Sequence, residues 1–253
     1  MRKLRDWICT VPFLVAFGLL MVLFDPVLRI ASLFGKRADA CACGVLQAGL
    51  VWILHICGIR VDVERSPHVK SKTTYIVVSN HQSMFDIPIF GYQLFSNLPR
   101  YIAKVELAGW IPSVSFELRH GGHAIINRKD RANAVKIIEQ LGSDLLRYGF
   151  SAVIFPEGTR ARRGALAQFK PAGTVALLTQ APGVPVVPVC IDNSWRIFEH
   201  SMMPVPFGIR IRCWIGDPIP RKENEDPYAL VAEAESQIRA AMSRLRGDQK
   251  RAA

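Results

Sequence analysis

Residues 74–88 read TYIVVSNHQSMFDIP, an apolar run that passes directly into polar residues. The β-branched and aromatic residues at its start predict a short buried strand. Polar residues then follow at the carboxyl end of this strand, which is the edge where α/β folds place their ligands. This one stretch therefore predicts a strand of an α/β sheet and a candidate site beside it.

Similar apolar runs recur along the chain, at residues 124–126, 151–155, 184–191 and 209–215. The intervals carry helical patterns, at residues 130–148, at residues 171–180 and from Pro227 onward. Strands that alternate with helices predict an α/β fold with a mostly parallel central sheet flanked by helices.

The N-terminal region is apolar in a different way. Residues 7–24 form an uninterrupted apolar run, and a second run at residues 45–59 contains Gln47 and His55. As a helix, the first run reaches roughly 27 Å, just short of the hydrocarbon core of a bilayer. Basic residues flank it on both sides, so charge gives no clean orientation. Either it crosses the membrane once, or the two helices lie embedded in one leaflet; we favour embedding.

The composition limits the possible functions. Half of the 253 residues are apolar and 21% are charged, which excludes wholesale disorder. The net charge of +11 calls for an anionic partner: nucleic acid, an anionic membrane or a phosphorylated substrate. The apolar N-terminus argues against nucleic acid. We expect membrane-associated helices in residues 1–60, one main domain in residues 61–246 and a polar tail in residues 247–253.

The six cysteines predict neither a disulfide framework nor a metal site. The chain is too large to need disulfides, and the spacing of its cysteines is irregular. Cys41 and Cys43 resemble half of a metal site, but no convincing second half accompanies them. We therefore expect no bound metal.

His81 and Asp86 are the strongest candidates for chemistry. On a regular helix, residues five apart are separated by about 140° around the axis, so these two can meet only if the chain turns first. Pro88 favours that, because proline is best tolerated in the first turn of a helix. Asp86 can then accept a hydrogen bond from one imidazole nitrogen, which leaves the other free to take a proton from a hydroxyl. Two alternatives stay open: a purely structural pair, and Ser83 as a nucleophile, although no G-x-S-x-G motif surrounds it.

Three other stretches add positive charge near predicted strand ends. Lys104 and Glu106 lie in the first, Arg128 ends the second, and residues 155–160 read FPEGTR. Arginine binds phosphate oxygens in a bidentate manner, and Gly158 lets the backbone approach a ligand closely. The three stretches together predict a phosphate-binding region.

These motifs resemble those of the lysophosphatidic acid acyltransferases, within the glycerolipid acyltransferase superfamily. Residues 80–86 look like its NH-x4-D motif, and residues 122–128 look like a second motif that ends in arginine. FPEGTR matches the third motif without a mismatch, and residues 184–189 look like the proline-containing fourth. The four occur in the order of the family, which makes the resemblance specific.

The resemblance implies a role for each matching residue. His81 would be the general base and Asp86 its orienting partner. The residues implied to shape the acceptor site are Glu157, Gly158, Thr159 and Arg160. Its phosphate would be held by Lys104, Arg128 and Arg160. Residues 184–189 would line a substrate pocket or simply belong to the core.

The resemblance also implies a glycerol-3-phosphate acyltransferase-like fold and a reaction. An acyl chain would pass from acyl-CoA or acyl carrier protein to a lysophospholipid, first of all 1-acylglycerol-3-phosphate, at the cytoplasmic face of an anionic membrane (the inner membrane in a bacterium). No cofactor, metal or nucleic acid would take part. Another lyso-lipid acceptor and a membrane-bound esterase remain alternatives. His123, Asn127 and Ala161 depart from the residues common in the family, which leaves the acceptor open.

Overall fold

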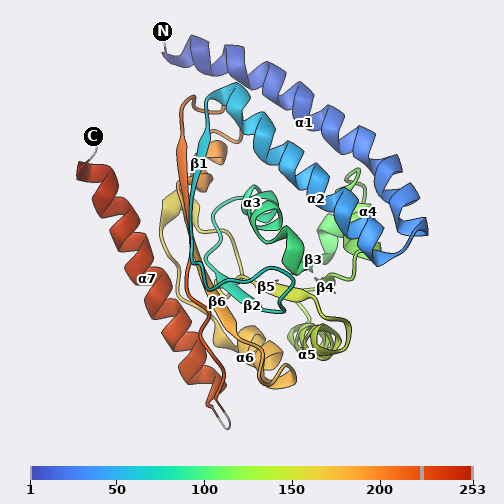
Figure 1. Ribbon diagram of the computed structural model, residues 1–253. Helices are drawn as coiled ribbons and strands as arrows, with labels where there is room; N and C mark the ends of the chain where they lie inside the picture. Colours follow the sequence, from blue (N-terminus) through green and yellow to red (C-terminus); the bar gives the residue numbers. More distant parts are fainter. Residues whose placement is uncertain (1, 223–224, 252–253) are drawn as a thin grey trace.

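The computed structural model describes residues 2–222 and 225–251, beginning with two long helices. Helix α1 (Arg2–Leu33) and helix α2 (Lys36–Trp52) lie side by side along one edge of the molecule (Figure 1). The chain reverses between them at Gly35, whose φ of +97° lies in the region that glycine adopts without strain. Judged by length and composition, α1 and the segment Lys36–Cys57, which continues α2 through a short 3₁₀ helix, are long and apolar enough to cross a bilayer.

Within the described residues, seven strands form one sheet in the order β1-β7-β6-β2-β5-β3-β4. The strands are β1 (Arg60–Arg65), β2 (Ile76–Ser79), β3 (Pro99–Lys104), β4 (Ala124–Ile126), β5 (Ser151–Ile154), β6 (Val186–Asp192) and β7 (Arg210–Ile215). All neighbouring strands run parallel except β6 and β7, which are antiparallel. The predicted α/β fold with a mostly parallel sheet is confirmed.

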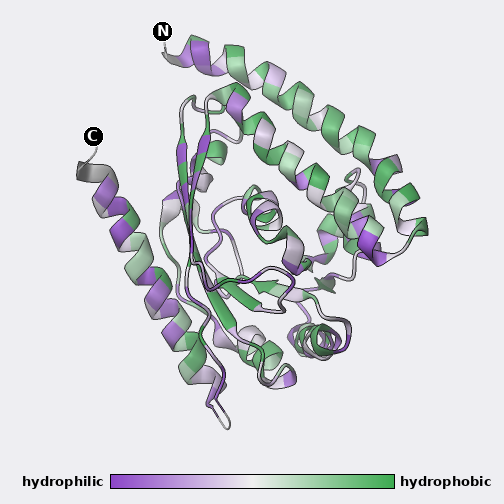
Figure 2. Ribbon diagram, viewed as in Figure 1, coloured by the Kyte–Doolittle hydropathy of each residue, from purple (hydrophilic) through white to green (hydrophobic). Residues whose placement is uncertain are grey.

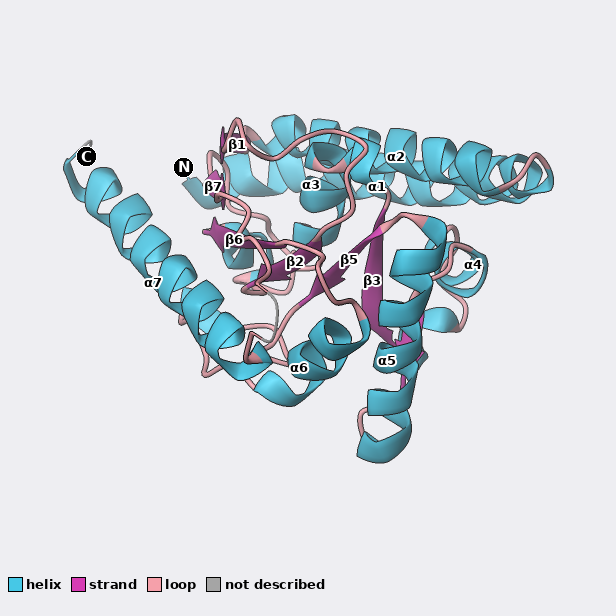
Figure 3. Ribbon diagram, turned by 60° about the horizontal axis from the view of Figure 1, so that its bottom comes forward, coloured by secondary structure: helices cyan, strands magenta, loops and turns pink. Residues whose placement is uncertain are grey.

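Helices cover both faces of this sheet. The other α-helices are α3 (Asp86–Gln93), α4 (Val114–His120), α5 (Arg131–Tyr148), α6 (Pro171–Gln180) and α7 (Pro227–Arg251). Short 3₁₀ helices are η1 (Ile53–Cys57), η2 (Phe95–Asn97), η3 (Val105–Ala108), η4 (Arg162–Gly164) and η5 (Ser194–Phe198). Figure 3 shows α1, α2 and α3 on one side of the sheet and α5, α6 and α7 on the other.

The alternation of side chains along the strands produces two cores. In β2, Val77 packs on the side of α1, α2 and α3, whereas Ile76 and Val78 pack on the side of α5, α6 and α7. Every residue of β2, β5 and β6 is buried. A parallel sheet covered on both faces requires such continuous apolar strands, which is why the sequence shows them as runs rather than as alternating patterns.

From residue 74 onward, the predicted strands and helices are found within about two residues of their expected ends. The two N-terminal helices do not follow the apolar runs 7–24 and 45–59 so closely, because α1 extends beyond the first run at both ends and α2 begins nine residues before the second. Two strands were not predicted. β1 lies at the edge of the sheet and carries charged residues along its length, so it shows no apolar run. β3 begins with Pro99 and contains Arg100, which also breaks the pattern. The helix α7 continues through Gly247 to Arg251, so the boundary at 247 does not coincide with the end of helical backbone; residues 252–253 lie outside the described part.

Helix α1 is apolar on two faces. One face packs into the core through Phe13, Met21 and Leu28. The opposite face exposes a stripe of apolar side chains at helical spacing, at Leu4, Ile8, Val11, Val15, Leu19 and Val22. Figure 2 shows hydrophobic colour over most of α1, whereas α7 alternates between polar and apolar residues. A helix that is apolar toward the protein and toward its surroundings suits a lipid environment.

Candidate active site

The segment after β2 turns before α3 begins, and this turn brings His81 and Asp86 together. The Nδ1 atom of His81 lies 2.8 Å from Oδ2 of Asp86. The backbone N–H groups of Gln82 and Ser83 donate to the same oxygen, at 2.7 and 2.9 Å. The turn is therefore wrapped around the carboxylate, and the predicted hydrogen bond between the two side chains is present.

A fourth donor approaches Asp86 from a distant part of the chain. The hydroxyl of Ser194, in η5 directly after β6, donates to Oδ1 of Asp86 at 2.6 Å. Asp86 and Ser194 are both fully buried. No motif in the sequence marks Ser194, so it was not among the predicted residues.

These contacts indicate which imidazole nitrogen carries a hydrogen. The backbone groups and Ser194 all act as donors, so the Asp86 carboxylate acts as an acceptor and Nδ1 of His81 carries the hydrogen. With the hydrogen on Nδ1, the nitrogen of the ring that can accept a proton is Nε2. The ring stacks on Phe155, with centroids 4.2 Å apart, and 16% of the His81 side chain is exposed, against none of Asp86. The pair has the geometry of a general base with its orienting carboxylate.

Glu157 lies beneath this pair and holds two loops in place. Its Oε1 accepts the backbone N–H of His81 at 2.9 Å, and its Oε2 accepts that of Ala167 at 3.0 Å. Burial raises the pKa of the Glu157 carboxyl, and these two N–H groups offset only part of the rise. Both oxygens of Glu157 therefore bind backbone groups of the protein, and the residue shapes the site by fixing the backbone of His81.

Two of the predicted basic residues, Lys104 and Arg128, lie at or just after the ends of adjacent strands on one side of the pair. Lys104 ends β3 and lies opposite Ile126 of β4, and Arg128 follows two residues later. The Arg128 guanidinium donates to the carbonyl of Gly158, which has a φ of +70°. Since β3 lies between β5 and β4, these residues form a cationic edge next to the FPEGTR loop.

Thr159 and Arg160 face a cavity on the other side of the loop. Its volume is about 730 Å³. Its lining is Gln82, Thr159, Arg160, Ala161, Arg163, Trp195, Phe198, Glu199 and His200. The Arg160 guanidinium lies 6.0 Å from the centre of the Phe198 ring. The predicted site residues thus divide into the edge with Lys104 and Arg128 and the cavity with Thr159 and Arg160.

Other residues of the motifs have structural roles. Asn80 exchanges two hydrogen bonds with the backbone of Ile191, each 2.8 Å long, and so joins the turn that contains His81 to β6. His123 accepts the backbone N–H of Tyr101 at 2.9 Å and contacts Glu117 at 3.1 Å. Ser83 is fully buried, and its hydroxyl accepts the N–H of Phe85 within its own turn. This position does not suit a nucleophile.

The strand formed by the fourth motif belongs to the core. Val187 and Val189 pack on the side of α1, α2 and α3, and Val186 packs on the opposite side. None of the three lines the cavity. Of the two interpretations of residues 184–189, the structure favours the core over a substrate pocket.

Comparison with known proteins gives concordant results. The family model described as Acyltransferase matches residues 60–192, just over half of the chain. The 1-acyl-sn-glycerol-3-phosphate acyltransferase alpha of Ovis aries is 31% identical over 194 residues, which cover 74% of this chain and 65% of that protein. The beta enzyme of Homo sapiens is 31% identical over 217 residues, 75% of each chain. The chain thus spans about two thirds of the length of the first of these relatives.

A solved structure has the same fold. The crystal structure of the 1-acyl-sn-glycerophosphate (LPA) acyltransferase PlsC from Thermotoga maritima superposes with a TM-score of 0.79. The superposition covers 97% of this chain and 98% of the other, at 23% sequence identity. The likeness therefore extends over the sheet and the helices on both of its faces.

Proposed function

This chain belongs to the acyltransferase family, and on that premise we propose that it transfers an acyl chain from an acyl thioester to the free hydroxyl of 1-acylglycerol-3-phosphate, which gives phosphatidic acid. The observation that carries the proposal is the hydrogen bond of 2.8 Å between His81 Nδ1 and Asp86, next to a cationic edge. The acceptor is the one that the names of the relatives print.

In the proposed reaction, Nε2 of His81 takes the proton of the lipid hydroxyl as its oxygen attacks the thioester carbonyl. The tetrahedral intermediate collapses, the carbon–sulfur bond breaks, and the imidazolium returns the proton to the departing sulfur. General-base assistance of this kind contributes ~10²–10⁴-fold to the rate. The buried Asp86 carboxylate stabilises the imidazolium between the two proton transfers. The chemistry asks for no metal or cofactor.

Lys104, Arg128 and Arg160 are proposed to hold the phosphate of the acceptor. Lys104 ends β3 opposite Ile126 of β4, Arg128 follows Ile126 by two residues, and the Gly158 carbonyl accepts one N–H of Arg128. The remaining guanidinium N–H groups are then available to phosphate oxygens. A phosphate anchored there positions the lipid hydroxyl, and positioning supplies much of the rate enhancement that a base alone does not.

The esterase alternative receives less support. A covalent route would need an accessible nucleophile, and Ser83 is fully buried within its turn. Direct hydrolysis, in which water attacks the ester, would use His81 as the base in the same way. It would leave Lys104 and Arg128 without a role. The combination of base and phosphate-binding residues therefore favours a phosphorylated alcohol as the acceptor.

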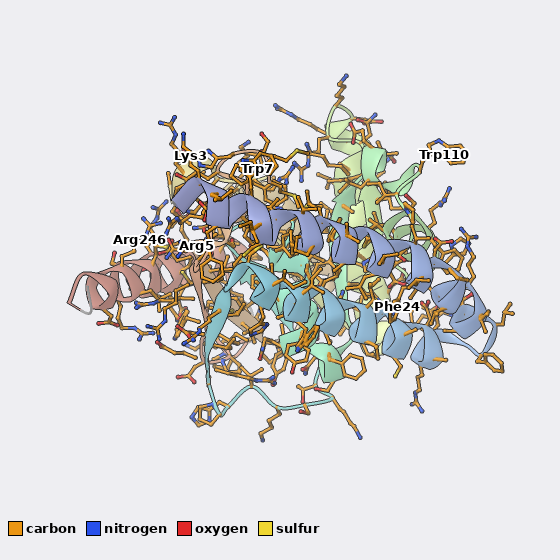
Figure 4. The ribbon with its side chains drawn as sticks, turned by 90° about the horizontal axis from the view of Figure 1, so that it is seen from above. Lys3, Arg5, Trp7, Phe24, Trp110 and Arg246 are labelled. Carbon is orange, nitrogen blue, oxygen red and sulfur yellow. The ribbon has the colours of Figure 1, made fainter. Side chains whose placement is uncertain are left out.

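We also propose that α1, α2 and the loop after η3 enter one leaflet of the membrane. Trp110 in this loop is 98% exposed. The loop is fastened to α1, because Ser113 donates its N–H to Asp25 at 2.8 Å and its hydroxyl to the Met21 carbonyl at 2.6 Å. Figure 4 shows Trp110 beside one half of α1, with Trp7 near the other end. Tryptophan favours the membrane interface, which agrees with this placement.

The charges at the start of α1 suit the same arrangement. Lys3 and Arg5 lie at its N-terminal end in Figure 4, where they can reach anionic headgroups. Embedding in the cytoplasmic leaflet would let a lipid acceptor and a water-soluble thioester donor reach one base. This is the orientation that we propose.

Product analysis tests the proposed reaction. The full chain is incubated in vesicles with a panel of lyso-lipids and both thioester donors, and the lipids are identified by mass spectrometry. We expect phosphatidic acid from the wild type and none above background from His81→Ala, with Asp144→Asn, a half-buried position on α5, as an active control. Free fatty acid without esterified lipid would instead identify an esterase.

Kinetics with a matched pair of lysine variants test the phosphate site. Lys104→Ala removes one charged contact, for which ~1.5–3 kcal/mol corresponds to a roughly 10–100-fold rise in KM for the phosphorylated acceptor. The KM for the donor should stay constant. Lys72→Ala, in an exposed turn before β2, is the control. An equal rise for both substrates would mean that Lys104 has no selective role.

A further inference from the structure

An arginine of the C-terminal helix reaches the end of the sheet that carries His81. Arg246 lies on α7 and follows Leu245, which is buried in the core on that side of the sheet. Its Nη2 lies 2.8 Å from Oδ1 of Asp192, and its Nε lies 3.2 Å from Oδ2. The same Nη2 donates to the carbonyl of Gly164. A contact with both carboxylate oxygens fixes the orientation of the carboxylate, which a single contact would leave free to turn.

Gly164 shows how closely this arginine packs. The residue ends η4, the short helix that follows the FPEGTR loop. A Cβ added to Gly164 would come within 2.5 Å of Nε1 of Trp195 and within 3.1 Å of Nη2 of Arg246. The guanidinium therefore lies directly against the backbone of this glycine, and Arg246 joins η4 to the end of β6.

Asp192, the last residue of β6, connects the arginine to the carboxylate of Asp86. Its Oδ1 also accepts a hydrogen bond of 3.4 Å from Nε2 of Gln82, whose backbone N–H donates to Asp86. Two residues after Asp192, the hydroxyl of Ser194 donates to Asp86 as well. Two of the four donors of Asp86 therefore belong to residues whose position depends on Asp192.

The burial of Asp192 makes its ion pair important for this arrangement. Only 1% of the residue is exposed, and among the described residues Arg246 is the cation that forms an ion pair with it. A buried carboxylate that loses its cation is strongly destabilised, so the end of β6 would move toward water or toward other donors. Such a movement would draw Ser194 and Gln82 away from Asp86.

We propose that Arg246 is a positioning residue for His81, which acts through Asp192 on the donors that hold Asp86. The proposal rests on the function proposed above, and it makes the C-terminal helix necessary for turnover. Arg246 lies 54 positions beyond Asp192 and outside all four sequence motifs. Because it acts on the orientation of the base, it should affect the rate of the chemical step and not the binding of either substrate.

Steady-state kinetics of three arginine variants test this role. Arg246→Met keeps the aliphatic stem but removes the charge, and it should lower kcat about 10-fold while both KM values stay constant. Arg246→Lys keeps a positive charge opposite Asp192 and should remain within about 3-fold of the wild-type kcat. Arg244→Met is the matched control, because Arg244 lies on the same helix and pairs with Glu64 of the edge strand β1, at 2.6 Å. A wild-type kcat in Arg246→Met, or an equal loss in either of the other two variants, would overturn the proposal.

A second set of variants keeps the test valid if the melting temperature shows that Arg246→Met does not fold. Asp192→Asn combined with Arg246→Met leaves no unpaired buried charge, so this variant should fold and show the same loss of about 10-fold in kcat. Adding Ser194→Ala to it should lower kcat by no more than a further factor of about 3, because the changes act on the same carboxylate. A larger further loss would show that Arg246 and Ser194 act independently, which contradicts the proposed route.

An NMR measurement tests the positioning without turnover. With ¹⁵N-labelled histidine in the full chain, the Nδ1–H signal of His81 is identified by its absence in His81→Ala, and its exchange with water is followed. Arg246→Met should speed this exchange at least about 10-fold, as expected for a loosened hydrogen bond to Asp86, and Arg244→Met should leave it unchanged. Equal exchange rates in Arg246→Met and the wild type would refute the proposal. Absence of phosphatidic acid from the wild type would instead refute the proposed function, and the exchange measurement would still decide the role of Arg246.

Discussion

Replacing Asp86 with asparagine tests how the carboxylate acts on His81, the proposed general base. Two backbone N–H groups point at Oδ2, so an amide at this position must place its oxygen there and its NH₂ toward Ser194. The serine hydroxyl can rotate to accept this hydrogen. The variant should therefore keep both the turn and the hydrogen on Nδ1 of His81, and lose only the negative charge.

The magnitude follows from the distance between the two groups. With Nδ1 and Oδ2 2.8 Å apart, the centres of the imidazolium and carboxylate charges lie roughly 4 Å apart, which is worth ~4 kcal/mol at an effective dielectric constant of ~20. At 1.36 kcal/mol per factor of ten, Asp86→Asn should lower kcat by about 10³-fold. The KM values should change little, since neither substrate touches Asp86, which is fully buried.

A double-mutant cycle shows whether the decrease in kcat caused by Asp86→Asn depends on His81. Turnover is followed by release of the free thiol, for the wild type, Asp86→Asn, His81→Ala and the double variant. Without the imidazole, the Asp86 carboxylate has no imidazolium to stabilise. The turnover rate of the double variant should therefore lie within about 3-fold of that of His81→Ala. Losses that multiply would show that Asp86 acts independently of the histidine. Melting temperatures near that of the wild type would show that each variant is folded.

Three other perturbations have expected outcomes. Ser194→Ala should lower kcat about 10-fold at unchanged KM, because the carboxylate loses one of its four donors, and Ser194→Thr should restore it; wild-type kcat in Ser194→Ala would remove this residue from the mechanism. Glu157→Gln orphans one backbone N–H, at a cost of ~1–3 kcal/mol at neutral pH. Because the pKa of Glu157 is raised in the fold, the free energy of unfolding of the wild type falls as pH rises from the unfolded pKa through the folded pKa. The gap in melting temperature between wild type and Glu157→Gln should therefore narrow as pH rises, and a widening gap would contradict this sign. Trp110→Ala should weaken sedimentation with anionic vesicles ~10-fold, whereas Tyr148→Ala, 63% exposed on α5, should have no effect; equal losses would contradict insertion of this loop.

The strands that the sequence predicts are those buried on both faces. β2, β5 and β6 must be apolar throughout, so their patterns are local and visible. β3 could not be recognised in this way, because it contains the charged residue Arg100. The Arg100 side chain is buried next to Glu117, with which it forms an ion pair of 3.4 Å. A partner that lies elsewhere in the chain leaves no periodic signal at the residue itself.

The residues of the site likewise differ in whether a local sequence pattern or a distant contact determines their position. The hydrogen bond between His81 and Asp86 depends on a turn of five residues, and Pro88 limits where a helix can start, so local chemistry predicts it. Ser194 reaches the same carboxylate from 108 positions away, and only the folded sheet brings it there. Glu157 shows a third case. Its motif identifies the residue but not the direction of its side chain, which points inward to the backbone.

The inner face of α1 makes the first helix inseparable from the turn that holds His81 and Asp86. The rings of Phe13 and Phe17 lie 6.0 and 5.9 Å from that of Phe85, the residue just before Asp86. Removing residues 1–60 to obtain a water-soluble enzyme would therefore strip the packing from beneath the carboxylate. Solubility has to be engineered on the outer stripe instead, by polar substitutions at positions such as Val15 and Leu19, which leave Phe13 where it is.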